Sequence, residues 1–319
     1  MISAKIIAHS ISQQGKTIIT WELEYPRFIH AEFMTHRMFS RNAASSRAIP
    51  VSAVIEQVRN NPAMPVHWGQ NQSGMQAKQE LPSALQRSAK FLWTQAAKSA
   101  AFIAEAMDKV GLHKQVANRI LEPFQLMKVV MTTTEDANWY WLRKHEDAQP
   151  EIHELARIMW EEQLKSVPVM LRPGDWHVPY FNGARGTGCW VQDADSDPLE
   201  EALAISSSCC AQVSFRKLDD RLEKAQTVYA RLVESEPVHA SPFEHQATPM
   251  VPSPYDLYDD EDLADCKIEV NLQDDACTWQ KGVTHVDRDN HFWSGNFCGF
   301  IQHRQLVPNN VCKNYKEFE

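Results

Sequence analysis

The chain has 319 residues, of which 43% are hydrophobic and 23% charged, and its formal net charge at pH 7 is −9. These values are typical of a soluble globular protein and argue against polymeric nucleic acid as a partner, because such a partner requires a basic surface. The sequence shows no apolar run long enough to cross a bilayer, no signal-peptide segment, and seven cysteines without Cys-x-x-Cys spacing. We therefore expect a cytoplasmic protein without membrane contact, and the lack of zinc-type His and Cys spacing predicts no metal site.

The first predicted elements are a strand and a helix. Apolar and polar residues alternate in residues 17 to 25, which predicts a half-buried strand with one solvent face. Pro26 can start a helix, since its missing N–H costs nothing at that position. This helix is expected to carry His36 and Arg37.

The following elements are predicted to be mostly helical. A polar loop is expected over residues 60 to 80, and residues 126 to 134 are apolar and Thr-rich, as in a strand. Apolar residues at helical spacing predict helices over residues 82–111, 113–121, 138–144, 151–165, 198–212 and 218–235. The first of these should pack through an apolar stripe that includes Leu85, Leu92 and Ile103.

Two segments show little periodicity. Residues 168 to 198 are rich in Pro, Gly, Asp and Trp and are predicted to be a linker between residues 1–167 and 199–319. These two parts are expected to form one compact domain. Residues 255 to 265 are acidic and are expected to be a solvated insertion without a catalytic role.

Residues 36 to 47 form the most informative motif, His-Arg-Met-Phe-Ser-Arg-Asn-Ala-Ala-Ser-Ser-Arg, which contains no acid. Arginine forks with short hydroxyl and amide groups can hold an anion with several oxygens, whereas a solvated basic helix end is the alternative interpretation. The spacing His-Arg-x-x-Ser-x-Asn-x-x-Ser-x-Arg resembles the signature of the flavin-dependent thymidylate synthases. In that family it holds FAD and the phosphate of dUMP.

Three further blocks resemble the same family. They are Arg119-Ile-Leu-Glu-Pro123 with Asn138-Trp-Tyr-Trp-Leu-Arg143, then Cys210-Ala-Gln-Val-Ser-Phe215, and His239-Ala-Ser-Pro-Phe-Glu-His245. The last block alone could be a hydrogen-bonded corner, but beside the other blocks it favours an active site.

The resemblance implies a role for each matched residue. The implied flavin ligands are His36, Arg37, Asn42, Asn138, Ser214, Ser241 and Glu244. The implied nucleotide ligands are Glu32, Ser45, Arg47, Arg119 and Arg143. Arg143 and His239 are the catalytic candidates, with Arg143 stabilising the pyrimidine anion through its charge.

The match has departures. Thr35 stands where the family has Arg, Ala43 where it has Glu, Asp147 where it has His, and Glu32 where it commonly has Gln. These positions concern flavin and nucleotide contacts. They motivate an alternative function, which is modification of C5 in another pyrimidine nucleotide, such as UMP or dCMP.

The order of the blocks is also unusual, because the family carries the Val-Ser-Tyr and Pro-Phe-Glu-His blocks before the His-Arg motif. A circular permutation would explain this order, and it requires His239 to lie beside Arg143 and Arg47 within one chain or between subunits. The strand over residues 17 to 25 should then share a sheet with elements that flank His239. A second His-Arg pair, His303-Arg304, is a weak internal repeat of the first.

The resemblance implies an α+β fold with a mostly antiparallel sheet and long packed helices, assembled as a homotetramer with sites between subunits. It implies reductive methylation of dUMP, in which methylenetetrahydrofolate supplies the carbon, FAD the hydride and NADPH the electrons. A non-catalytic nucleotide-binding relative is the remaining alternative.

Overall fold

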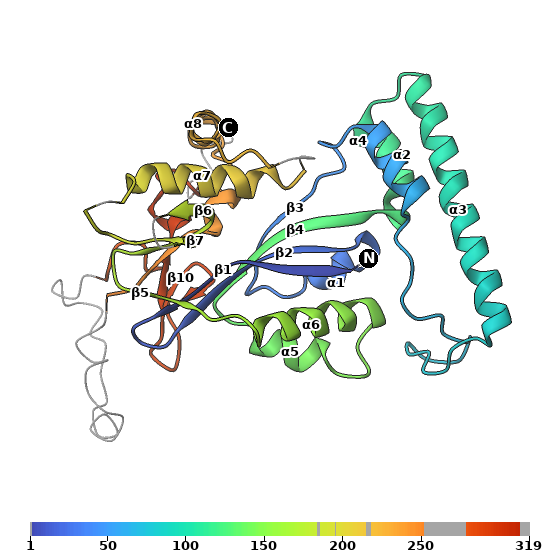
Figure 1. Ribbon diagram of the computed structural model, residues 1–319, viewed down its shortest axis with the longest axis horizontal. Helices are drawn as coiled ribbons and strands as arrows, with labels where there is room; N and C mark the ends of the chain where they lie inside the picture. The colour runs from blue at the N-terminus through green and yellow to red at the C-terminus, as the bar shows by residue number, and fades with distance from the viewer. Residues whose placement is uncertain (1, 184–185, 195, 215–217, 252–278, 313–319) are drawn as a thin grey trace.

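The computed structural model describes residues 2–183, 186–194, 196–214, 218–251 and 279–312 (Figure 1). Its largest sheet has five strands in the order β3-β4-β2-β1-β5. Their bounds are β1 Ser3–Ser12, β2 Thr17–Pro26, β3 Ser40–Ala43, β4 Leu126–Thr133 and β5 Val169–Leu171. Neighbours pair antiparallel except β1 and β5, which are parallel. The strands predicted over residues 17–25 and 126–134 are confirmed and lie side by side.

A second sheet has the order β12-β8-β6-β7, and a third, small sheet has the order β11-β10-β9. The bounds are β6 Trp176–Gly183, β7 Gly186–Trp190, β8 Ala247–Pro249, β9 His285–Val286, β10 Phe292–Ser294, β11 Phe297–Cys298 and β12 Phe300–Gln302. The predicted linker over residues 168–198 is therefore wrong, since it contains β5, β6 and β7. Trp176, Val178 and Phe181 are buried and anchor this hairpin in the core.

The predicted helices are largely confirmed. Their bounds are α1 His30–Phe33, α2 Val51–Asn60, α3 Ser83–Lys109, α4 Lys114–Ala117, α5 Ala137–Arg143, α6 Pro150–Gln163, α7 Leu199–Ala211 and α8 Leu222–Glu234. Short 3-10 segments are η1 Arg27–Ile29, η2 Asn118–Phe124, η3 Gln212–Ser214, η4 Ser241–Glu244 and η6 His303–Leu306. Two predictions are corrected. The helix after Pro26 ends at Phe33, before His36, and the helix over 113–121 continues as a 3-10 segment that includes Pro123.

Both faces of the five-stranded sheet are covered. Helices α5 and α6 pack on one face, where Trp21 and Leu23 join Trp139 and Leu155 in the main core. The second sheet and α7 lie on the other side of β1 and β2 (Figure 1). The prediction that β2 is half-buried is therefore wrong, since Thr20, expected on its solvent face, is fully buried.

Helix α3 lies at the edge of the molecule, along α2 (Figure 1). Its buried stripe consists of small residues, including Ala97, Ala100, Ala101 and Ala104, which allow α2 to approach closely. The predicted stripe is wrong, because Leu85, Leu92 and Ile103 are exposed. A row of large apolar side chains thus remains on the outer surface of this helix.

The expected α+β class, with mostly antiparallel sheets and long packed helices, is confirmed. Within the described ranges, no helix is both long enough and apolar enough to cross a bilayer. The acidic segment 255–265 lies outside the described residues.

Candidate functional site

A cavity of about 290 Å³ lies between the loop that follows α1 and helix α5. The loop and α5 supply most of its walls. The lining residues are Thr35, His36, Arg37, Met38, Phe39, Glu135, Asn138, Trp139, Leu142 and Arg143. Four residues that the sequence motifs implicated, His36, Arg37, Asn138 and Arg143, are therefore brought together although up to 107 positions separate them.

The loop that presents His36 and Arg37 has a defined shape. It begins where the Thr35 hydroxyl donates a hydrogen bond to the carbonyl of Glu32 at 2.7 Å. From the neighbouring strand β3, the Arg41 guanidinium donates to the carbonyl of His36 at 2.8 Å and to that of Met34 at 3.3 Å. Arg41 thus ties two carbonyls of the loop to strand β3.

The imidazole of His36 is held as a neutral hydrogen-bond acceptor. Its Nε2 accepts from Nε of Arg143 at 2.9 Å, so the proton resides on Nδ1. Burial, and then the charges of Arg143 and Arg41, lower the pKa of His36 to about 4. The ring also packs edge-on against Trp139, with 4.7 Å between centroids. Because His36 is neutral, it can orient Arg143 through this hydrogen bond without repelling the positive guanidinium.

The guanidinium of Arg143 keeps donors for a ligand. Besides the bond to His36, its Nη2 donates to the hydroxyl of Thr35 at 3.4 Å. Thr35 stands where the resemblance expected an arginine, and here it contacts the predicted catalytic cation. Two of the five N–H groups of Arg143 are used in these contacts, and the residue lines the cavity.

The Val-Ser block packs on the end of strand β3. The hydroxyl of Ser214 accepts a hydrogen bond from the backbone N–H of Ser45 at 2.9 Å. The amide of Asn42 donates to the carbonyl of Cys210 at 3.1 Å. These contacts join blocks that lie about 170 positions apart and bring the predicted ligands Asn42, Ser45 and Ser214 into one cluster.

The Pro-Phe-Glu-His block also packs against β3. Glu244 forms an ion pair with Arg304, and its charge also acts on Arg41, where it opposes the lowering of the pKa by burial. The ring of His245 is fully buried and its Nδ1 bonds to the hydroxyl of Thr132 at 2.8 Å. This block therefore reaches the same strand as the Val-Ser block.

Not every expectation of the permutation holds. Strand β2 and strand β8, which follows His245, belong to different sheets, so the prediction of a common sheet is wrong. His239 and Ser241 are exposed and are not among the residues that line the cavity. The proximity of His239 to Arg143, within one chain or between subunits, stays a prediction.

Four of the predicted nucleotide ligands also lie outside the cavity, namely Glu32, Ser45, Arg47 and Arg119. Arg47 is exposed, and Glu32 is partly exposed at the end of α1. Arg119 forms an ion pair with Glu122 at 2.8 Å, and Glu122 forms a second ion pair with Arg27 at 3.0 Å. The predicted basic ligands thus divide into a set that lines the cavity, Arg37 and Arg143, and a set that does not, Arg47 and Arg119.

The sequence did not indicate a buried polar chain between the two large sheets. It runs from Ser10 to Nδ1 of His177 at 2.9 Å, from Nε2 of His177 to Thr20 at 2.8 Å, from Thr20 to Thr132 at 2.7 Å, and on to His245. Burial lowers the pKa of both histidines to about 3, so both are neutral. This row of hydrogen-bonded side chains ties the Pro-Phe-Glu-His block to β2 and β4. The role of His177 was not predicted from the sequence, because His177 lies in the predicted linker.

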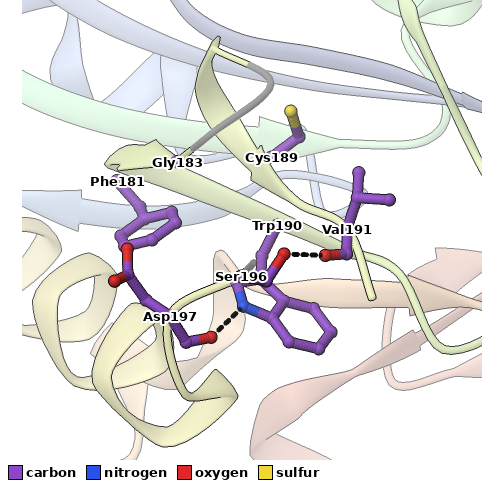
Figure 2. Close-up of a pocket in the computed structure, with 7 residues that line it drawn as sticks. All are labelled: Phe181, Gly183, Cys189, Trp190, Val191, Ser196 and Asp197. Carbon is purple, nitrogen blue, oxygen red and sulfur yellow. Dashed lines mark hydrogen bonds between the residues drawn. The ribbon is translucent and has the colours of Figure 1, made fainter. Parts of the chain in front are cut away.

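A second cavity lies near the β6-β7 hairpin and is too small to bind a nucleotide or a flavin. It is lined by Phe181, Gly183, Cys189, Trp190, Val191, Ser196 and Asp197 (Figure 2). The indole of Trp190 donates to the carbonyl of Asp197 at 2.7 Å and closes the loop that leads to α7. The volume of about 10 Å³ has room for a water molecule at most.

The described residues contain no group of three or more His, Cys, Asp or Glu side chains that could hold a metal ion. The donors around the larger cavity are instead guanidinium and amide groups, with Glu135 as the acid.

A family model matches the part of the chain that contains the first two motif blocks, while the Val-Ser and Pro-Phe-Glu-His blocks lie outside the matched part. A sequence model of the family described as "Thymidylate synthase complementing protein" matches residues 9–169, which is just over half of the chain. No curated protein matches the chain. Similar solved structures include a UMP/dUMP methylase PolB from Streptomyces cacaoi bound with 5-Br dUMP, at 15% identity and a TM-score of 0.44, over 53% of this chain and 91% of that chain. The same enzyme bound with 5-Br UMP gives 16% identity and a TM-score of 0.44, over 53% and 90% of the two chains.

Proposed function

We propose, since the chain belongs to the thymidylate synthase complementing protein family, that it methylates C5 of a pyrimidine nucleotide, with dUMP as substrate and FAD as cofactor. One observation carries the proposal. Within the matched residues 9–169, the fold places His36, Arg37, Asn138 and Arg143 around one cavity. Family membership supplies the flavin-dependent chemistry, and this cavity supplies the donors for it.

The residues present suit a flavin. Arg37, Arg143 and Asn138 offer charged and neutral donors to the polar edge of a ring or to a phosphate, and Trp139 and Leu142 form an apolar wall. About 290 Å³ is at the low end of ligand cavities, which range over roughly 300–1,000 Å³. One chain can therefore enclose a part of a dinucleotide, and a second surface must complete the site.

The side chains divide the work as follows. Bound FAD would supply the hydride, with NADPH as electron source and methylenetetrahydrofolate as carbon source. Arg143 places its charge on the pyrimidine and stabilises the anion that makes C5 nucleophilic. Neutral His36 accepts from Nε of Arg143 and so fixes the direction of the guanidinium.

The remaining predicted nucleotide ligands would fix the substrate. We propose that Arg47 and Arg119 bind the phosphate, with Ser45 and Glu32 at the sugar and base, and His239 near the nucleotide. Because Arg47, Arg119 and His239 do not line the cavity of this chain, we propose that sites form between subunits of a homotetramer.

The surface of α3 offers an interface for such an assembly. Phe91, Leu92 and Phe102 are between 60% and 68% exposed on this helix. Sedimentation velocity would test this proposal. The double variant Leu92→Glu with Phe102→Glu should shift the protein to smaller species, whereas the charge reversal Lys165→Glu, at an exposed position outside α3, should leave the assembly unchanged. An unchanged assembly in the double variant would remove α3 from the interface.

The function is tested first by titrating the purified protein with FAD, followed by fluorescence and by the flavin absorbance bands. Saturable binding at micromolar FAD is expected. Turnover is then assayed with methylenetetrahydrofolate and NADPH, and the products from dUMP, UMP and dCMP are identified by mass spectrometry. A protein that binds a pyrimidine nucleotide but no flavin would favour a non-catalytic relative instead.

A related activity is the second candidate. The contact between Thr35 and Arg143 replaces the arginine expected from the family by a short hydroxyl beside the predicted catalytic cation. This change alters the charge next to the base. Preferential turnover of UMP or dCMP over dUMP would identify this second activity.

A further inference from the structure

The segment from Asn296 to Arg304 contacts two of the motif blocks, although neither the family motifs nor the cavity assigns it a role. The amide of Asn296 donates to the carbonyl of Met38 at 3.0 Å, in the loop that presents His36 and Arg37. The amide of Gln302 is buried and lies 3.2 Å from the hydroxyl of Ser40 and 3.4 Å from the carbonyl of Glu244. The segment therefore supports β3 and the Pro-Phe-Glu-His block together.

The carboxylate of Glu244 is paired with Arg304. Arg304 forms the ion pair with it, and a second guanidinium nitrogen of Arg304 donates to the carbonyl of Asn310 at 3.2 Å. The side chains of Arg304 and Glu244 are only 30% and 20% exposed, so solvent screens this pair less than a surface pair. Segment η4, which contains Glu244, packs against β3, the strand of Arg41, and the charge of Glu244 acts on Arg41.

Arg41 already has a task that Glu244 could disturb. Its guanidinium donates to the carbonyls of His36 and Met34 and thereby fixes the loop at the cavity. A partly buried carboxylate without a partner is costly and recruits the nearest cation. Without Arg304, Glu244 would draw Arg41 away from the loop, and the loop would lose two hydrogen bonds.

We propose that Arg304 is a positioning residue for the flavin site, acting through Glu244. It holds the Glu244 carboxylate in one orientation and keeps Arg41 on the loop of His36. The inference rests on the proposed function, because FAD is the proposed cofactor and the resemblance implies Glu244 as one of its ligands. It gives the second His-Arg pair a use that differs from that of the first pair, since Arg304 works behind the site.

The test is a double-mutant cycle on FAD binding to the full chain. Arg304→Gln should weaken FAD binding about tenfold, which corresponds to a hydrogen bond to a charged group. Arg304→Lys keeps the charge and should lose about threefold or less. In the background of Glu244→Gln, the change Arg304→Gln should add almost nothing, because the carboxylate that disturbs Arg41 is then absent.

The matched control is Arg157→Gln on α6, where Arg157 is paired with Glu154 at 2.8 Å outside the site, and it should bind FAD as the wild type does. Circular dichroism spectra confirm that each variant is folded, and Arg304→Lys carries the test if Arg304→Gln does not fold. Wild-type affinity in Arg304→Gln, a loss in Arg304→Lys as large as that in Arg304→Gln, or additive losses in the double variant would overturn the proposal. A wild-type protein that binds no FAD would instead contradict the proposed function.

Discussion

The two His-Arg pairs have similar sequences but very different surroundings. Each pair follows a fully buried phenylalanine by three positions, Phe33 before His36 and Phe300 before His303. Both imidazoles are less than a tenth exposed, and the pKa of each is lowered to about 4. Neither the local sequence nor the burial of the imidazole therefore gives a reason to assign the two pairs different roles.

What differs is the set of groups that each imidazole meets. His36 accepts a hydrogen bond from Arg143 and lines the larger cavity. His303 is packed among the rings of Trp176, Tyr229 and Phe243, and its Nδ1 has no hydrogen-bond partner among the described residues. Because a binding group needs both a polar partner and access to a ligand, His36 fits the proposed site, whereas His303 is packed in the core.

The arginines of the two pairs differ in the same way. Arg37 is exposed at the cavity, whereas Arg304 is engaged by Glu244 and by the carbonyl of Asn310. A paired arginine is a poor ligand for a phosphate, because it must first release its carboxylate. Whether an arginine already has an ion-pair partner is therefore a better guide to phosphate binding than its place in a sequence motif.

The largest effect is expected at the partner of His36. Arg143→Ala should lower turnover about a hundredfold or more, because it removes the charge that stabilises the pyrimidine anion. Its flavin content should fall far less. Initial rates and flavin absorbance of the purified variant measure both quantities, and Arg157→Ala on the outer surface of α6 serves as the control. Normal turnover in Arg143→Ala would remove this residue from the mechanism.

The sequence predicted single helices and strands more successfully than the packing between them. The contact between His36 and Arg143 was not predicted, whereas strand β2 and helix α5 followed from alternation and helical spacing. The strands within residues 168–198 did not, because Pro179 interrupts the alternation of β6 and glycines surround the turn. A period-two pattern broken by these residues cannot be told from a loop without knowing its neighbours.

The other errors come from tertiary packing. The periodicity of α3 gave a helix, but the partner helix α2 packs against alanines such as Ala97 and Ala101, and leaves the larger side chains outside. Thr20 was assigned to solvent because nothing local shows that a second sheet covers it. Contacts between distant elements decide which face of an amphipathic element is buried, and local sequence does not contain them.

The second prediction concerns the pH dependence that burial gives to His303. Its pKa is lowered by burial from 6.5 to about 4, so between these values the unfolded chain binds a proton and the folded chain does not. The stability that the neutral ring supports is thus fully present above pH 6.5 and is lost as the pH falls toward 4. The free energy of unfolding of the wild type should therefore fall between pH 7 and pH 4, and His303→Phe should make this fall smaller by about 3 kcal/mol.

Urea denaturation at pH 7 and at pH 4 measures this difference. At pH 7, His303→Phe should be as stable as the wild type or more stable by about 1 kcal/mol, because the buried Nδ1 without a partner is replaced by carbon. FAD binding should be unchanged, whereas His36→Phe should lose it. A His303→Phe variant that loses FAD while remaining folded would place the second pair in the site and break the comparison.

The smallest effect is expected for the arginines that would bind phosphate, and it separates an unpaired group from a paired one. The side chain of Arg47 is exposed, and in the described part of the chain it has no ion-pair partner, while Arg119 is held by Glu122 at 2.8 Å. Arg47→Ala should raise the KM for the nucleotide about tenfold with kcat nearly unchanged, because a phosphate contact stabilises the bound substrate and the transition state equally. Arg119→Ala should raise it less, since Arg119 must give up its ion pair in order to bind. Steady-state kinetics with varied dUMP compare the two variants. A larger KM effect for Arg119→Ala than for Arg47→Ala would show that pairing in the ligand-free chain does not determine which arginines bind the nucleotide.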